Sequence, residues 1–175
     1  VGLAQLIAEA NGTEGIVHIK EKIAEMVVYV TLIRGGLEAA IVNAEKSPEG
    51  WCFPSELYTN AAKHYGGSEF SRMVQHLQDI AGGATVTVPS TKDFANPVVG
   101  DDIRKYMRTK EGIDGEYRAQ LFRTIRDYTA DALGGWNLVT MLQSGGGLYA
   151  QRLVTRKHYD MDRAKRQALH VADLA

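Results

Sequence analysis

The chain has 175 residues, of which 45% are hydrophobic and 23% are charged, a composition typical of one globular domain. Its net charge of −1 excludes the strongly basic field of a nucleic-acid-binding protein, and no apolar run approaches the length that crosses a bilayer. The only cysteine, Cys52, excludes an internal disulfide and fits a reducing compartment, so we expect a cytoplasmic protein that binds neither nucleic acid nor membrane.

The first ten residues already have apolar positions at helical spacing, and no capping residue precedes them. Asn11-Gly12 is a typical C-terminal stop, and Thr13 is a candidate cap for the helix that follows. A sequence that begins in this way is typical of the interior of a helix. We therefore expect residues 1–175 to be a single helical domain from the C-terminal part of a longer protein.

The second predicted helix carries a heptad pattern that fades near Lys46–Pro48. Two series of apolar residues are spaced by seven, which predicts a seam packed against other helices; they are Ile16, Ile23, Val30 and Leu37, and Ile19, Met26, Ile33 and Ala40. Gly35-Gly36 lies inside this helix at a cost in helix propensity. We expect another helix to approach closely at that point.

The middle of the chain predicts shorter elements. After a loop at 49–53, a helix begins at Pro54–Glu56 and is expected to end at 64–67, and another runs from Ser68 to Gly82-Gly83. Ala84–Val88 alternates polar and apolar residues before Pro89, which predicts one short extended segment. Helices starting at 96 and 116 follow.

Two glycine-rich breaks organise the last part of the chain. Gly134-Gly135 is expected to separate two helices, and a turn at Ser144–Gly147 precedes a single final helix. Glycines before a helix can present N–H groups to an anion, but the spacing is neither Walker nor Rossmann, so a plain turn is the simpler interpretation.

No pattern assigns a catalytic or metal-binding residue. Glu14 and His18 are four residues apart, a spacing that can hold a metal ion, but no second pair accompanies them and a solvated helix face is favoured. Cys52 is more typical of a small packed side chain than of a nucleophile.

Three segments resemble the C-terminal helical domain of the 4-hydroxyphenylacetate 3-hydroxylase family, which also includes 4-hydroxybutyryl-CoA dehydratase. They are AEANGTEGIVHIKEKIAEM at 8–26, DIAGGATVTVPSTKDF at 79–94 and LGGWNLVTMLQSGGGLYAQRL at 133–153. The resemblance implies an all-α, four-helix-bundle-like domain of the acyl-CoA dehydrogenase type, with short flanking helices. It also implies a homotetramer.

The same resemblance implies a flavin-dependent monooxygenase that hydroxylates a small aromatic substrate ortho to its hydroxyl group. It would use O₂ and reduced FAD supplied by a separate flavin reductase. The implied FAD contacts are Gly134, Gly135, Trp136 and Asn137, although the hydroxylases commonly have an arginine near the position of Trp136. Ser144, Gly145 and Gly146 are the second candidate contact.

Two alternatives remain open. A dehydratase similar to the 4-hydroxybutyryl-CoA enzyme would add a [4Fe–4S] cluster to FAD, and because Cys52 is the only cysteine, the other cysteine ligands would lie upstream. The third interpretation is a non-catalytic helical module that mediates oligomerisation.

Overall fold

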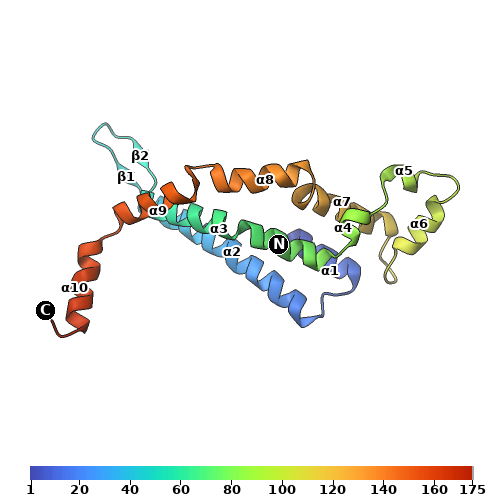
Figure 1. Cartoon of the computed structure of the whole chain (residues 1–175), viewed down its shortest axis with the longest axis horizontal. Helices are drawn as coiled ribbons and strands as arrows, with labels where there is room; N and C mark the ends of the chain where they lie inside the picture. Colours follow the sequence, from blue (N-terminus) through green and yellow to red (C-terminus); the bar gives the residue numbers. More distant parts are fainter. Residues whose placement is uncertain (175) are drawn as a thin grey trace.

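The computed structural model describes residues 1–174, and it confirms the all-α prediction (Figure 1). The elements in chain order are α1 (Gly2–Asn11), α2 (Val17–Val42), β1 (Glu45–Lys46), β2 (Cys52–Phe53), α3 (Glu56–Ala81), α4 (Ala84–Thr87), α5 (Thr91–Phe94), α6 (Gly100–Met107), α7 (Gly115–Thr129), α8 (Ala132–Gln143), α9 (Gly147–His158) and α10 (Met161–Val171). None of the described helices is both long and apolar enough to span a membrane.

The long helices α2 and α3 lie side by side and form the axis of the molecule (Figure 1). α9 packs along α3 near the hairpin end, while α1, α7 and α8 pack against α3 farther along. α5 and α6 lie beyond α7, and α10 turns away from the bundle. α3 contacts α1, α2, α7, α8 and α9, so these helices are arranged around it.

The tightest core lies between α1 and α7. Ile7, Phe122 and Ile125 are fully buried there, together with small residues of α1 such as Ala4 and Ala8. The hairpin end of the bundle buries little apolar surface in this single chain, because several large apolar residues of α2 remain exposed.

The predicted helix end at Gly66-Gly67 is wrong, because α3 continues through it. Both glycines are buried, and each is needed for packing between helices rather than for a turn. A Cβ atom at Gly67 would come within 2.9 Å of the Met141 carbonyl oxygen of α8, and one at Gly66 within 3.3 Å of Ile33 Cδ1 of α2. Tertiary packing therefore offsets the low helix propensity of the pair.

The predicted approach of another helix at Gly35-Gly36 is confirmed for Gly36. A Cβ atom there would come within 2.6 Å of Ala62 Cβ on α3, whereas Gly35 faces open space. The heptad seam is only partly buried: Ile19, Met26 and Ala40 are inside, but Val30 and Leu37 are 49% and 58% exposed. Thr13 does not cap α2; its hydroxyl donates a hydrogen bond to the carbonyl of Ala8.

The predicted extended segment at 84–88 is also wrong, because Ala84–Thr87 forms the short helix α4. The hydroxyls of Thr85 and Thr87 donate to the carbonyls of Gly82 and Gly83, at 2.8 and 3.3 Å, so the threonines stabilise a helical turn. The only described strands form an antiparallel hairpin in the expected loop, with Glu45 opposite Phe53 and Lys46 opposite Cys52.

Two boundaries near the C-terminus differ from expectation. Gly134 and Gly135 lie inside α8, and the chain instead breaks at Ala130-Asp131, where the Asp131 carboxylate accepts a hydrogen bond from the Ala132 N–H. The single final helix is divided at Tyr159-Asp160, and Asp160 caps α10 through the N–H of Arg163.

Candidate functional site

The turn between α8 and α9 has the geometry of an anion-binding loop. Gly145, Gly146 and Gly147 have φ angles of 79°, 93° and 69°, a left-handed conformation that side chains with a Cβ disfavour. Ser144, Gly145 and Gly146 are exposed, and Gly147 is the first residue of α9. The N-terminal N–H groups of α9 therefore face solvent at the positive end of the helix dipole.

The other predicted contacts lie in the first turns of α8, away from this glycine turn. Gly134 is buried against α7: a Cβ atom would come within 2.6 Å of the Thr129 carbonyl carbon. Gly135 meets nothing within 4 Å, and Trp136 is 64% exposed. At 1.5 Å per residue, about 14 Å of helix separates Gly135 from Ser144, so the structure places the two groups along one helix and not in one compact pocket.

Asn137 of α8 lines a largely apolar cavity of about 270 Å³, whose other walls come from α1, α2, α3 and α7. Tyr29, Met73 and Tyr128 are among the other residues that line it. The Tyr29 hydroxyl donates to the carbonyl of Gly66, and burial raises the pKa of this phenol. Of the four α8 candidates, Asn137 alone lines a described cavity.

A second cavity, about 340 Å³ in volume, adjoins Ser144 at the other end of α8. It lies between α2, α3, α8 and α9, and we call it the Gln151 cavity after its one fully buried polar side chain. Sequence reasoning missed Gln151, because a glutamine among the charged residues of α9 gives no signal of burial.

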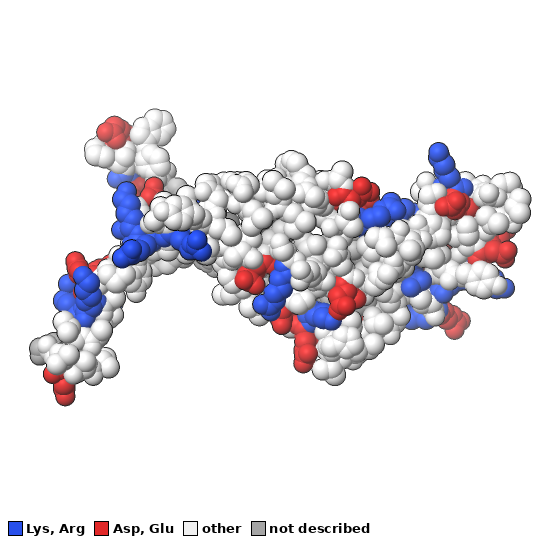
Figure 2. All heavy atoms as spheres, viewed as in Figure 1, with Lys and Arg blue, Asp and Glu red and all other residues white. Residues whose placement is uncertain are grey.

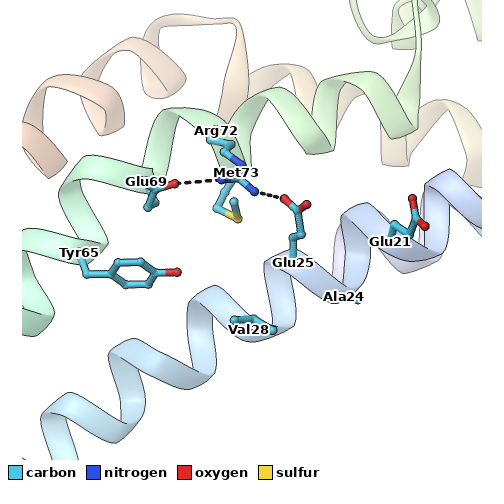
Figure 3. Close-up of a pocket in the computed structure, with 8 residues that line it drawn as sticks. All are labelled: Glu21, Ala24, Glu25, Val28, Tyr65, Glu69, Arg72 and Met73. Atoms are coloured by element: carbon cyan, nitrogen blue, oxygen red, sulfur yellow. Dashed lines mark hydrogen bonds and ion pairs between the residues drawn. The ribbon is translucent and has the colours of Figure 1, made fainter.

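A charged groove of about 390 Å³ runs between α2 and α3 (Figure 3). Figure 3 shows Glu25 of α2 facing Arg72 of α3, and His76 Nε2 lies 2.7 Å from the same carboxylate. The hydrogen bond from Arg72, followed by that from His76, lowers the pKa of Glu25. Because Glu25 pairs with both Arg72 and His76, this cluster links the two helices.

The described residues do not form a metal site. No group of three potential ligands occurs within residues 1–174. Glu14 forms an ion pair with Lys110 at 3.1 Å and lies before the start of α2, so it does not share a helix with His18. Cys52 is exposed on β2.

These features define a helical-bundle domain with shallow, partly apolar cavities along α8 and a glycine turn suited to an anion. The chain belongs to the family described as the 4-hydroxyphenylacetate 3-hydroxylase C-terminal domain, whose profile matches residues 1–173. This confirms the resemblance found in the three sequence segments.

Curated relatives include the oxygenase component of 4-hydroxyphenylacetate 3-monooxygenase from Thermus thermophilus, 29% identical over 77% of this chain and 27% of that protein. Another is 4-hydroxybutyryl-CoA dehydratase/vinylacetyl-CoA-Delta-isomerase from Clostridium aminobutyricum, 25% identical over 99% of this chain and 37% of that protein. The chain thus spans about a quarter to a third of the length of these relatives.

Solved structures from both branches superpose closely. The archaeal 4-hydroxybutyryl-CoA dehydratase from N. maritimus has a TM-score of 0.90 and 29% identity, covering 99% of this chain and 35% of the dehydratase. The 4-hydroxyphenylacetate 3-monooxygenase oxygenase component in complex with FAD has a TM-score of 0.90 and 25% identity, covering 97% of this chain and 35% of that one.

Proposed function

We propose that this chain is the C-terminal helical domain of a flavin-dependent monooxygenase that hydroxylates a phenolic compound ortho to its hydroxyl group. The observation that carries the proposal is the family match over residues 1–173, joined by a relative of the same fold solved with FAD. The longer enzyme would assemble as a homotetramer and receive reduced FAD from a separate reductase. The catalytic groups would lie outside residues 1–175.

The glycine turn fits an anionic part of FAD such as its pyrophosphate. Three consecutive left-handed glycines place no side chain of their own at the start of α9, and the helix dipole favours negative charge there. Reduced FAD bound there would supply the oxygen-activating chemistry. This chain would supply orientation through the turn at Ser144–Gly146 and, farther along α8, a wall that includes Trp136 and Asn137.

A dehydratase of the 4-hydroxybutyryl-CoA type is the second candidate. It is favoured by the likeness to the archaeal dehydratase, whose identity of 29% extends over 99% of this chain. The residues described here do not fit an iron–sulfur cluster, because Cys52 is the only cysteine and no cluster of metal ligands surrounds it. Any such cluster would be held by residues outside this chain.

An activity assay on the protein that carries this chain separates the candidates. With a flavin reductase, NADH, FAD and O₂, the hydroxylase proposal expects conversion of 4-hydroxyphenylacetate to its ortho-dihydroxy product. Anaerobic dehydration of 4-hydroxybutyryl-CoA without any hydroxylation would overturn this proposal in favour of the dehydratase. Tetramer formation without flavin binding or either activity would favour a non-catalytic oligomerisation module.

A further inference from the structure

The Gln151 cavity contains two buried polar atoms that have no hydrogen-bond partner within residues 1–174. Gln151 is 1% exposed and its Oε1 atom accepts no hydrogen bond, while its Nε2 atom reaches the Ser144 carbonyl only at 3.5 Å. Thr59 Oγ1, which belongs to a second residue of the same cavity lining, is also buried and unpaired. Buried polar groups are nearly always paired in native proteins, so two orphans in one cavity point to a missing polar partner.

A cation lies in the same cavity lining. No acidic side chain within residues 1–174 is within ion-pair distance of Lys63. Its side chain crosses the glycine turn: a Cβ atom at Gly145 would come within 2.7 Å of Lys63 Cε and 3.0 Å of Nζ. Because Gly145 has no Cβ atom, the Lys63 side chain can lie across the turn and beside the cavity.

The remaining walls are mainly apolar, with Ile33 from α2, Ala62 from α3 and Met141 from α8. This combination sets three requirements for a ligand. It needs an apolar body, a group that can both donate to Gln151 Oε1 and pair with Thr59 Oγ1, and an anion for Lys63. A single hydroxyl has the chemistry to pair with both orphan atoms, since it can donate to the amide oxygen and accept from the threonine hydroxyl.

We propose that the Gln151 cavity binds a small phenolic acid, with the phenol hydroxyl at Gln151 and Thr59, the ring against Ile33 and Met141, and the carboxylate at Lys63. This is a binding site within the helical domain and involves no chemical step. The choice of a phenolic acid rests on the proposed function, whereas the polar and apolar requirements of the cavity do not.

The test titrates the full chain with three probes: 4-hydroxyphenylacetate, phenylacetate, which lacks the hydroxyl, and 4-methylphenol, which lacks the carboxylate. Saturable binding of the phenolic acid, with a dissociation constant of about 1 mM, is expected by calorimetry or NMR. Loss of the hydroxyl should weaken binding about tenfold in the wild-type chain but not in Gln151→Leu. Loss of the carboxylate should likewise weaken binding about tenfold to the wild-type chain, but not to Lys63→Ala.

Two further variants complete the test, one as a control and one as a second probe of the hydroxyl contact. Lys157→Ala removes an exposed lysine of α9 outside the cavity and should bind the acid as the wild type does. Thr59→Val keeps the side-chain shape and should weaken the phenolic acid more than phenylacetate, which replaces the Gln151 result should that variant fail to fold.

Melting of the ligand-free chain adds an independent readout. Gln151→Leu removes an unsatisfied buried atom. Its melting temperature should therefore be the same as that of the wild type or up to about 4 °C higher. The proposal is overturned by an absence of saturable binding, or by equal affinities of phenylacetate and 4-hydroxyphenylacetate for the wild-type chain. Either result leaves the hydroxylase proposal standing, because product formation by the longer enzyme is measured separately.

Discussion

Gly134 and Gly135 are neighbours in α8, yet a Cβ atom meets opposite surroundings at the two positions. At Gly134 it would lie within 2.6–3.0 Å of three Thr129 backbone atoms, whereas at Gly135 nothing lies within 4 Å. Neither glycine has a positive φ. The pair is therefore explained by one close approach between α7 and α8, and not by a turn.

The two alanine variants should change stability in opposite directions. Gly134→Ala forces the helices apart and should lower the free energy of unfolding by about 1–3 kcal/mol. Gly135→Ala should raise it by up to about 1 kcal/mol, because alanine is the better helix former. Chemical denaturation of both variants measures the difference, and equal effects would contradict the packing at Thr129.

Gly135→Val then becomes a clean probe of FAD binding in the longer enzyme. A Cβ atom at this position contacts nothing within 4 Å, and valine is not a worse helix former than glycine. The melting temperature of the variant should therefore equal that of the wild type. If Gly135 lies against FAD, the dissociation constant should rise about 5- to 100-fold, equivalent to about 1–3 kcal/mol. An unchanged constant would remove the start of α8 from the flavin site and leave Ser144–Gly146 as the candidate.

The ion-pair cluster at Glu25 predicts an acid-dependent loss of stability. Arg72 and His76 lower the Glu25 pKa below its ordinary value of 4.5, so the folded chain favours the ionised carboxylate more than the unfolded chain does. This contribution is present above pH 4.5 and is lost as pH falls through the lower pKa of the folded state. Glu25→Gln should make the melting temperature fall less steeply as the pH is lowered below 4.5.

The matched control for that experiment is Glu111→Gln. Glu111 is exposed and makes no ion pair within residues 1–174, so its replacement should leave the acid limb unchanged. If the melting temperatures of the Glu25 variant and the wild type fall equally below pH 4.5, the ion pairs of Glu25 do not contribute to the stability of the α2–α3 contact.

At the scale of the elements, α2 presents more apolar surface than its own bundle covers. Its exposed large apolar residues run the length of the helix; they are Val17, Val27, Val28, Val30, Leu32, Leu37, Ile41 and Val42. A helix that leaves this many large apolar side chains exposed is a candidate interaction face. We therefore predict that α2 takes part in subunit contacts.

Leu37→Lys should therefore dissociate an assembly while leaving the single chain folded. Leu37 is 58% exposed in the monomer, so a lysine there is hydrated until a second copy covers it. Sedimentation of the chain should show oligomers that this variant shifts to monomer, and Val98→Lys, at an exposed site beyond the bundle, should not. A wild-type chain that stays monomeric at high concentration would contradict self-association through α2.

The long, strongly periodic helices could be predicted from sequence, and the glycine pairs could not. Gly66-Gly67 and Gly134-Gly135 are local helix breakers by propensity, but tertiary contacts with Met141 and Thr129 decide the outcome. Ala84–Thr87 alternates as a strand does, yet threonine side chains bonded to the backbone hold it as a helical turn. By contrast, the start of α5 depends on a local signal, because Ser90 and Asp93 form a capping box in which each side chain accepts the other's backbone N–H.

The candidate site was predictable to a similar extent. The glycine turn at Ser144–Gly147 follows from composition, but the left-handed conformation of Gly145, Gly146 and Gly147 is seen only in the structure. Gln151, Thr59 and Lys63 carry no sequence signal, because their significance depends on which side chains from three other helices enclose them. Whether any of the predicted residues contacts FAD stays a prediction.

At the scale of the whole molecule, the proposed FAD contacts would form only one side of a site. The glycine turn and the start of α8 lie on the surface, with Trp136 and Gly145 both exposed. The isolated chain should therefore bind FAD, oxidised or reduced, with a dissociation constant weaker than about 100 µM. Fluorescence titration measures it, and micromolar binding would show that residues 1–175 contain the complete site.

α10 has a consequence for local unfolding. The helix is 11 residues long, buries none of its residues and turns away from the bundle after Asp160 (Figure 1). A helix of this length is marginal in water on its own. Figure 2 shows its charged side chains spread over a segment that stands clear of the body.

The amide protons of α10 should therefore exchange with solvent deuterium through local fraying, many orders of magnitude faster than those of the buried α7. Their protection would then report on whatever covers α10 in a larger assembly. Slowing that grows with protein concentration would indicate a second copy, whereas slowing only in a longer chain would indicate another domain. The exchange rate of the α10 amide protons would therefore be a sensitive measure of assembly, because α10 has so little protection of its own.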